Sequence, residues 1–407
     1  MLTKETRLGS CNAAFDVVPL KEMIDKNDAG SWGSDPVDIS MNVVRSTNFN
    51  ETGYLDLSNV AKRFLVPETF EELKLEENEI LIERSGGSET QPVGRVSFIT
   101  KEVADQGFAY ANFIQRISAK PGIDPKYLFY CLYQMHSAGF TQIMQNQTNG
   151  IRNLEYRFFL KQRLPKPEFI EQQKIAAILS SIDNSIKATR TSIEKLDRLK
   201  KSLMQNLLTG KMKPDGSWRN EDDFYQDEKL GQYPKEWAIG RVKEFFVLQR
   251  GHDLTDLEAK AGKYPVVKSN GISINHYEFK AKAPGVVTGR SGTIGNVFYI
   301  DKDFWPHNTT LYVKDFCGNI PRYVYYLLIF MRLDIYLAGT GVPTLNRNDI
   351  HRLRCIFPKT TDIQQQIVSI LDEVVNNIDI KKTKVTKLEK LKKSLMQKLI
   401  TGQVRVK

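Results

Sequence analysis

Two arginines in this chain, Arg84 and Arg290, stand before matching Ser-Gly pairs, each after a short run of β-forming residues. An arginine guanidinium can bind the edge of a guanine base through two hydrogen bonds, or it can grip a phosphate group. Glycines beside it allow another backbone to approach closely. These residue types suit DNA recognition, whereas the alternative is a tight turn whose arginine is only solvated. The candidate residues here are Arg84, Ser85, Gly86, Arg290, Ser291 and Gly292.

Two further pairs of polar segments could add contacts to bases. The segments RSTN at 45–48 and KSNG at 268–271 cluster the donors and acceptors that base edges require. A third pair, at 145–152 and 338–344, carries glycines and small polar side chains. The alternative for all of them is that the polar residues only form turns. The candidate DNA-binding residues of these segments are Arg45, Ser46, Asn48, Asn149, Arg152, Lys268, Ser269, Asn270, Thr340 and Thr344.

Catalytic motifs are missing from the sequence. It contains no Asn/Asp-Pro-Pro-aromatic motif of an amino-methyltransferase, no phosphate-binding loop and no His-Glu-x-x-His zinc motif. The run from Gly289 to Gly295 resembles a dinucleotide-binding loop only superficially, because its glycine spacing differs. The four cysteines lie far apart, which favours free thiols in a reducing compartment. We therefore expect a non-catalytic chain that binds no metal or cofactor itself.

Length and composition indicate a globular, multi-domain, basic protein. A chain of 407 residues is longer than a typical single domain with one hydrophobic core, and 41% of its residues are hydrophobic. The formal net charge of +10 favours a polyanionic partner. The longest apolar run, Tyr323 to Met331, is far shorter than the roughly 20 residues of a membrane span, and the N-terminus lacks a signal-peptide pattern. We expect the protein to stay in the cytoplasm.

The strongest pattern is an internal repeat. The sequence KKSLMQNLLTGK begins at Lys200 and KKSLMQKLITGQ begins at Lys392, with nine of twelve positions identical. The same 192-residue register carries back to Gln172 and Gln364, where QQKIAAIL faces QQQIVSIL. The chain therefore holds two copies of one long segment.

Each copy predicts a long amphipathic helix. Apolar residues recur at steps of three, four and seven, no proline interrupts the pattern, and each copy stops at Thr-Gly. About 36 residues give a helix about 54 Å long. We expect the two helices to bury their stripes against each other as an antiparallel coiled coil, a structural spacer more than a functional surface. The candidate interface residues are Ile175, Ile178, Ile182, Leu196, Leu203, Leu207, Ile367, Ile370, Val374, Leu388, Leu395 and Leu399.

The repeat continues, more weakly, into the regions before the helices. PKYLFY at Pro125 matches PRYVYY at Pro321, and GIRNL at Gly150 matches GVPTL at Gly341, with different lengths between the matches. A shared framework with divergent loops predicts two homologous domains that bind different ligands. The fold class is mixed α/β, with two homologous globular domains, two long helices and a pseudo-twofold repeat. We expect a first domain at 1–160, a central helical region at 165–212, a linker at 213–236, a second domain at 237–357 and a C-terminal helical region at 362–404.

The chain resembles a known family, the specificity subunits of type I restriction-modification enzymes. The resemblance rests on EQQKIAAILSSID at 171–183, the paired KKSLMQxLxTG helix ends, YPKEW at 233–237 and the RSG pattern followed by G-x-V at 84–96 and 290–297. It covers nearly the whole chain. The first domain lacks a counterpart of Trp237, and the second helix entrance reads TDIQQQ instead of containing EQQ.

The resemblance implies two target-recognition domains that each read one half of a bipartite DNA site, with the helices as ruler and docking platform. Two methylation subunits would supply S-adenosylmethionine chemistry on adenine N6. Restriction subunits using ATP and magnesium would join for cleavage. The resemblance transfers no individual DNA contact, because the recognition loops are where such proteins differ.

Two other hypotheses fit the residues. The chain could be the recognition subunit of a fused methyltransferase-nuclease outside type I, which its gene neighbours would reveal. Alternatively, it could be a two-domain scaffold that binds only protein, which a DNA-binding assay would distinguish. The target DNA sequence and the gap between its halves cannot be deduced from the residues.

Overall fold

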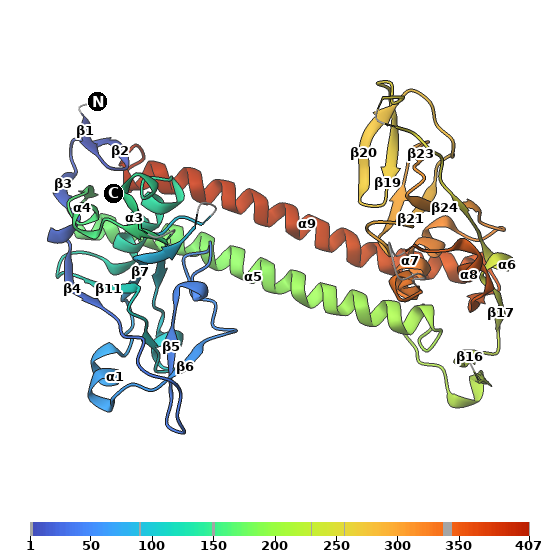
Figure 1. Cartoon of the computed structure of the whole chain (residues 1–407), viewed down its shortest axis with the longest axis horizontal. Helices are drawn as coiled ribbons and strands as arrows, with labels where there is room; N and C mark the ends of the chain where they lie inside the picture. Colours follow the sequence, from blue (N-terminus) through green and yellow to red (C-terminus); the bar gives the residue numbers. More distant parts are fainter. Residues whose placement is uncertain are drawn as a thin grey trace. The chain divides into compact units, whose positions relative to one another are not determined.

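The computed structural model describes residues 3–88, 91–148, 151–228, 230–255, 257–336 and 344–406. The chain forms two compact units (Figure 1). Unit 1 combines residues 1–189 with residues 384–407, and unit 2 is the continuous segment 190–383. Within the described ranges, no helix has both the length and the apolar composition needed to cross a membrane.

Unit 1 is built on a four-stranded antiparallel sheet in the order β4-β11-β7-β9. Helix α3 packs against this sheet, and its Tyr127, Leu128 and Leu132 share one core with Ile80 and Ile82 of β7. A smaller sheet in the order β10-β5-β6 pairs β10 with β5 in parallel. The bounds are β4 Ile24–Ala29, β5 Met41–Val44, β6 Ala61–Arg63, β7 Ile80–Glu83, β9 Val96–Phe98, β10 Ala109–Tyr110, β11 Ile114–Ala119 and α3 Pro125–Ser137.

Unit 2 repeats this topology element by element. Its antiparallel sheet has the order β18-β24-β21-β22, its smaller sheet has the order β20-β19-β23 with β23 parallel to β19, and α7 takes the place of α3. The internal repeat and the mixed α/β class predicted from the sequence are therefore confirmed. The bounds are β18 Val247–Arg250, β19 Tyr264–Lys268, β20 Gly271–His276, β21 Gly285–Gly289, β22 Val297–Ile300, β23 Trp305–Pro306, β24 Thr310–Asp315 and α7 Pro321–Met331.

The repeated segments form the helices α5, Phe169–Leu208, and α9, Thr361–Ile400, of 40 residues each, slightly longer than predicted. Both end as the Thr-Gly pattern predicts, because Gly210 and Gly402 adopt left-handed φ angles of 70° and 67° that favour glycine. The residues from Pro321 to Tyr336 predict one helix in the second domain, but α7 stops at Met331. Arg332 has a φ of 49° there, which ends the regular hydrogen bonding.

The two long helices pack antiparallel in each unit. In unit 1, Lys392 of α9 forms an ion pair with Asp183 of α5 at 2.6 Å, while Arg405, just beyond α9, pairs with Glu171 at 2.7 Å. In unit 2, the end of α5 shares a core with the start of α9. Every predicted interface residue is at least half-buried. The fully buried ones are Ile175, Ile182, Leu207, Ile367, Val374 and Leu399, and the half-buried ones are Ile178, Leu196, Leu203, Ile370, Leu388 and Leu395.

A second buried stripe on these helices was missed. Leu179 and Met396 lie in the core of unit 1, and Met204 and Leu371 lie in the core of unit 2. These residues also obey the 192-residue register, which was the available signal. Each long helix therefore buries one stripe beside its partner helix and another against a globular core.

Two equivalent glutamines join each globular core to its long helix. Gln172 is fully buried; its side-chain oxygen accepts from the Asp124 amide at 2.9 Å, and its amide group donates to the Pro167 carbonyl at 2.8 Å. Gln364 repeats both contacts in unit 2, accepting from the Ile320 amide at 2.9 Å and donating to the Pro358 carbonyl at 3.4 Å. A buried amide satisfied on both sides fixes the angle at which α3 or α7 meets its long helix.

A β-hairpin and a two-stranded sheet close each unit at the end of a long helix. In unit 1, the Asn12 amide donates to the Thr401 carbonyl at 2.8 Å, so the first hairpin lies beside the end of α9 (Figure 1). A Cβ on Gly402 would lie 2.6 Å from the Phe15 ring, and one on Gly210 would lie 3.2 Å from the Trp237 ring. Phe15 therefore occupies the place of Trp237, the tryptophan that the first domain lacks. The bounds are β1 Thr3–Thr6, β2 Gly9–Asn12, β3 Asp16–Pro19, β14 Arg163–Lys166, β15 Phe224–Asp227, β16 Gly231–Pro234, β17 Trp237–Arg241 and β25 Arg354–Pro358.

The remaining elements are short and lie between these. They are the helices α1 Pro67–Leu73, α2 Lys101–Ala104, α4 Tyr156–Phe159, α6 Val242–Phe245 and α8 Arg347–Arg352, the strands β8 Ser85–Gly87, β12 Gln145–Thr148 and β13 Ile151–Leu154, and the 3-10 turns Leu20–Glu22, Ser46–Asn48, Gln142–Met144, Glu221–Asp223 and Leu333–Ile335.

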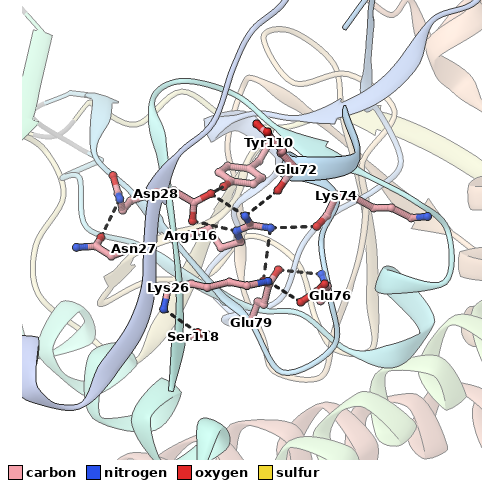
Figure 2. Close-up of polar contacts among 11 residues, drawn as sticks. Lys26, Asn27, Asp28, Glu72, Lys74, Glu76, Glu79, Tyr110, Arg116 and Ser118 are labelled. Atoms are coloured by element: carbon pink, nitrogen blue, oxygen red, sulfur yellow. Dashed lines mark hydrogen bonds and ion pairs between the residues drawn. The ribbon is translucent and has the colours of Figure 1, made fainter. Parts of the chain in front are cut away.

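A charged cluster within unit 1 ties the segment after α1 to the sheet. Figure 2 shows the Arg116 guanidinium of β11 between the carboxylates of Asp28 and Glu79. It donates two hydrogen bonds to Asp28, at 2.7 and 3.1 Å, and further bonds to the carbonyls of Glu72 and Lys74 at 2.8 and 3.0 Å. Burial raises the pKa of Glu79, although Arg116 opposes that rise. This cluster holds the polypeptide that leads into β7, and Arg84 directly follows the last residue of β7, Glu83.

Candidate nucleic-acid interface

Three of the predicted polar segments converge in unit 1. The Ser46 hydroxyl donates to the Ser85 carbonyl at 3.2 Å, which joins the turn after β5 to the start of β8. Strand β13 pairs antiparallel with β8, placing Arg152 opposite Gly87. Gly86 has a φ of 104°, so the turn requires glycine there. The structure thus brings together three loops, of which the first and the last lie more than 100 residues apart in the sequence.

The matching segments converge in unit 2. The amide of the buried Ser269 donates to the Thr309 hydroxyl at 3.3 Å, and the Arg290 amide donates to the Thr309 carbonyl at 2.8 Å. Ser291 forms an isolated bridge with Thr344. A Cβ on Gly292 would lie 3.3 Å from the Ser269 hydroxyl oxygen, so these turns are in close contact. Lys268 is half-buried and Asn270 is exposed beside them, whereas Asn149 and Thr340 lie outside the described residues.

Arg84 and Arg290 occupy the same backbone position. The Arg84 amide donates to the Phe113 carbonyl, as the Arg290 amide does to Thr309, both at 2.8 Å. The Arg84 carbonyl accepts from Leu154, and the Arg290 carbonyl accepts from Leu345, again both at 2.8 Å. The two halves therefore share the same backbone hydrogen bonds around this arginine, a common backbone frame that can carry different side chains.

The side chains around the two arginines differ. Arg84 donates to the Gln115 side-chain oxygen at 2.9 Å, and its guanidinium carbon lies 5.0 Å from the centre of the Tyr156 ring. Gln115 and Tyr156 both donate to the side-chain oxygen of Asn27, at 2.8 and 2.6 Å. Arg84 is therefore held within a polar network. Within the described part of the chain, the Arg290 guanidinium donates only one long bond of 3.5 Å, to the Asn308 carbonyl.

Asn48 has a structural role in this conformation. It is 2% exposed; its side-chain oxygen accepts from the Arg45 amide at 3.0 Å, and its amide group donates to the carbonyls of Asp56 and Asn59 at 2.8 and 3.0 Å. Its donors and acceptor are thus used inside the loop. A DNA contact by Asn48 stays a prediction, as it does for Arg45 and Ser46, which are half-buried.

A buried ion pair lies beneath that loop and was not identified from the sequence. Arg95 donates to both carboxylate oxygens of Glu83, at 2.7 and 2.8 Å, and to the carbonyls of Phe49 and Ser46 at 2.8 and 2.9 Å. The two charged side chains are 6% and 1% exposed. Burial raises the pKa of Glu83, against the lowering effect of Arg95. The pair positions the loop that carries Arg45 and Ser46.

The arrangement offers hydrogen-bond donors and positive charge but no metal centre: the described part of the chain holds no group of three or more His, Cys, Asp or Glu side chains placed to bind a metal ion. Arginine, serine and glycine on converging turns can contact phosphates and base edges. The arrangement of these residues suits recognition more than catalysis.

Comparison with known proteins decides the family. A family model described as the type I restriction modification DNA specificity domain matches residues 18–198 and 234–390. The chain belongs to this type I specificity family. The family is the DNA-recognition component of type I restriction-modification systems, and its two matched segments correspond to the two halves of the repeat.

Relatives and solved structures agree with the family assignment. The MjaVIII specificity subunit of Methanocaldococcus jannaschii is 25% identical over 383 residues, covering 86% of this chain and 84% of the relative. The MjaIX specificity subunit is 23% identical over 350 residues, covering 77% and 76%. The S subunit from M. genitalium has a TM-score of 0.61 at 15% identity, covering 98% of this chain and 99% of that one. A chain from a study of assembly and conformational transition of the type I system has a TM-score of 0.54 at 11% identity, covering 97% and 99%. These structures share the fold.

Proposed function

We propose that this type I specificity chain reads a bipartite DNA target, with one half-site read by residues 1–160 and the other by residues 237–357, the two target-recognition domains. The supporting observation is the common backbone frame around Arg84 and Arg290, on which the surrounding side chains differ. A rigid shared frame with divergent loops is how one scaffold recognises two different ligands.

The decisive experiment is an exchange of one domain. Residues 240–355 are replaced by the corresponding segment of another type I specificity subunit, and the complex is assembled with its methylation subunits. Sequencing of methylated DNA should then show a change in one half of the target only. If both halves change together, the two domains do not read DNA independently and the proposal is wrong.

The long helices act, in this proposal, as the ruler between half-sites. Inserting seven residues after Thr189 and seven after Thr383 keeps the apolar stripe in register and adds about 10.5 Å to each helix. At about 3.4 Å per base pair, the unspecified gap should grow by about three base pairs, with both half-sites unchanged. An altered half-site with an unaltered gap would contradict the ruler.

The partners follow from the same proposal. Two methylation subunits dock on the helical regions and supply S-adenosylmethionine chemistry on adenine N6, and restriction subunits with ATP and magnesium join for cleavage, all in the cytoplasm. The chain itself contributes recognition and no chemistry. Purified alone and incubated with S-adenosylmethionine and target DNA, it should transfer no methyl group, and transfer by the single chain would overturn this part.

A further inference from the structure

A hollow of about 370 Å³ in unit 2 gathers three arginines around the recognition turns. Its lining includes Arg250 at the end of β18, Arg290 directly after β21 and Arg347 at the start of α8. Neither Arg250 nor Arg347 was singled out from the sequence. The remaining lining residues are Leu311, Thr344, Leu345 and Asn346.

Among the described residues, the charge in this hollow is largely uncompensated. The one carboxylate of that set in an ion pair with Arg250 is that of Asp253 at 3.8 Å, and both side chains are more than half exposed. Such an exposed, long ion pair contributes little. Within the same described ranges, the Arg290 guanidinium donates only to a backbone carbonyl, which carries no net charge. Three guanidinium groups around one hollow repel each other, and an anion bound between them removes that repulsion.

The corresponding place in unit 1 lacks this cluster. The strand registers and the shared amide contacts match Arg250 with Ala29, Leu311 with Gln115, and Arg347 with Tyr156. Gln115 and Tyr156 are the residues that engage Arg84. In unit 2 the same positions offer an apolar leucine and a second arginine, so Arg290 stays available to a ligand.

We propose that Arg250, Arg290 and Arg347 form a binding site for a single DNA backbone phosphate, present in the second half of the chain only. A phosphate diester carries a full negative charge and oxygens that accept bidentate guanidinium bonds, whereas the acceptors of a guanine edge carry no net charge. A site of this kind fixes the register of the second domain on the duplex without reading sequence. The proposal rests on the DNA-binding function proposed above.

The test uses the assembled complex, the cognate duplex and an unrelated duplex. Arg290→Ala should weaken binding to both about tenfold but lower the slope of log affinity against log salt by less than one, because Arg250 and Arg347 still contact the phosphate. The triple alanine variant should lower that slope by about one, because the three arginines share one phosphate. A fall of about three would mean separate phosphates and would overturn the shared site.

The phosphate itself is located with duplexes that carry one neutral methylphosphonate at successive positions. At one linkage beside the second half-site, neutralisation should weaken wild-type binding about tenfold but binding by the triple alanine variant less than twofold. Arg352→Ala is the matched control, because Arg352 lies on the same helix α8, is 75% exposed and does not line the hollow. It should respond to the neutral linkage as wild type does.

Failure of this inference is distinguishable from failure of the proposed function. If exchange of residues 240–355 changes one half-site but the triple alanine variant keeps the wild-type affinity, salt slope and methylphosphonate response, the phosphate site alone is refuted. If the assembled wild-type complex shows no preference for any duplex, the recognition function itself is refuted.

Discussion

Replacing Arg95 by methionine should destabilise the recognition loop of unit 1 while leaving unit 2 intact. Methionine keeps most of the side-chain length, so the substitution removes charge and hydrogen bonds more than packing volume. The Glu83 carboxylate and the carbonyls of Ser46 and Phe49 all lose their donor.

The expected cost is about 4 kcal/mol. Removing one partner of a buried ion pair costs about 3 to 5 kcal/mol, because the remaining charge stays buried without compensation. Burial already raises the pKa of Glu83, and losing Arg95 should raise it further. A carboxyl whose folded pKa exceeds its unfolded value lowers stability as pH rises through the interval between them. The Arg95→Met variant should therefore lose stability, relative to wild type, as pH rises above the usual glutamate range near 4.5.

Hydrogen exchange provides the assay, because it reports each unit separately. Amides of residues 45–49 should exchange faster in Arg95→Met, and those of unit 2 should not change. The double variant Glu83→Gln with Arg95→Met removes both charges and should be more stable than Arg95→Met alone. In the assembled complex, recognition of one half-site should weaken while the other is retained.

Two results would refute this reasoning. If Arg95→Met lowers the free energy of unfolding by less than about 1 kcal/mol, the ion pair contributes no more than an exposed salt bridge does. A double variant as unstable as the sum of the two single variants would show that no buried charge was left uncompensated. Unit 2 supplies a natural comparison, since the residues matching Glu83 and Arg95 there are Gly289 and Asn296.

Three further predictions concern stability. Gln364→Leu should destabilise unit 2 by about 1 to 3 kcal/mol by leaving buried backbone groups unpaired, whereas the exposed neighbour in Gln365→Leu should change little; thermal unfolding of both variants checks this. Burial lowers the pKa of His136 to about 4, so the free energy of unfolding should fall as pH drops from about 6.5 toward 4, by up to about 1.4 kcal/mol per pH unit. Denaturant titrations across that pH range should show a weaker dependence in His136→Gln. Gly210→Ala should cost at least about 1 kcal/mol, since φ is 70° and the new Cβ would meet Pro234 at 2.3 Å; an unchanged melting temperature would contradict the left-handed helix end.

The repeat was the part of the fold that the sequence predicted best. Identical residues 192 positions apart report on one structure built twice, so the helices and their glycine ends could be found without coordinates. The turns were matched from shorter similarities at other spacings. Leu179 and Leu371 were missed because a helix between two partners buries two stripes, and the stronger periodic stripe hid the other. Phe15 was missed as the counterpart of Trp237 because the shared requirement is an aromatic ring against a helix-end glycine, not one residue type.

The backbone turns of the candidate site could be predicted from the sequence, but the contacts between its side chains could not. The Ser-Gly turns could be matched because glycine marks conformations that other residues avoid. Arg250 and Arg347 could not be linked to Arg290, since the register of β18 on β24 and the start of α8 bring them together across about a hundred residues. The hydrogen bonds of Asn48 within its own loop could not be predicted either, because the sequence does not show whether a polar side chain in a turn bonds to nearby backbone groups.

The division of the two units along the chain sets an order for folding during synthesis. Unit 2 is continuous, so it can complete its core before the chain is finished, whereas unit 1 needs residues 384–407 to cover Ile175 and Leu179. At about 5 to 20 residues per second, about 10 to 40 s separate the synthesis of residue 189 from that of residue 396. During that interval the apolar residues of α5 in unit 1 lack the core partners Met396, Leu399 and Ile400, which have not yet been synthesised. Aggregation of nascent chains should therefore begin in unit 1, and slower translation of the last third should aggravate it.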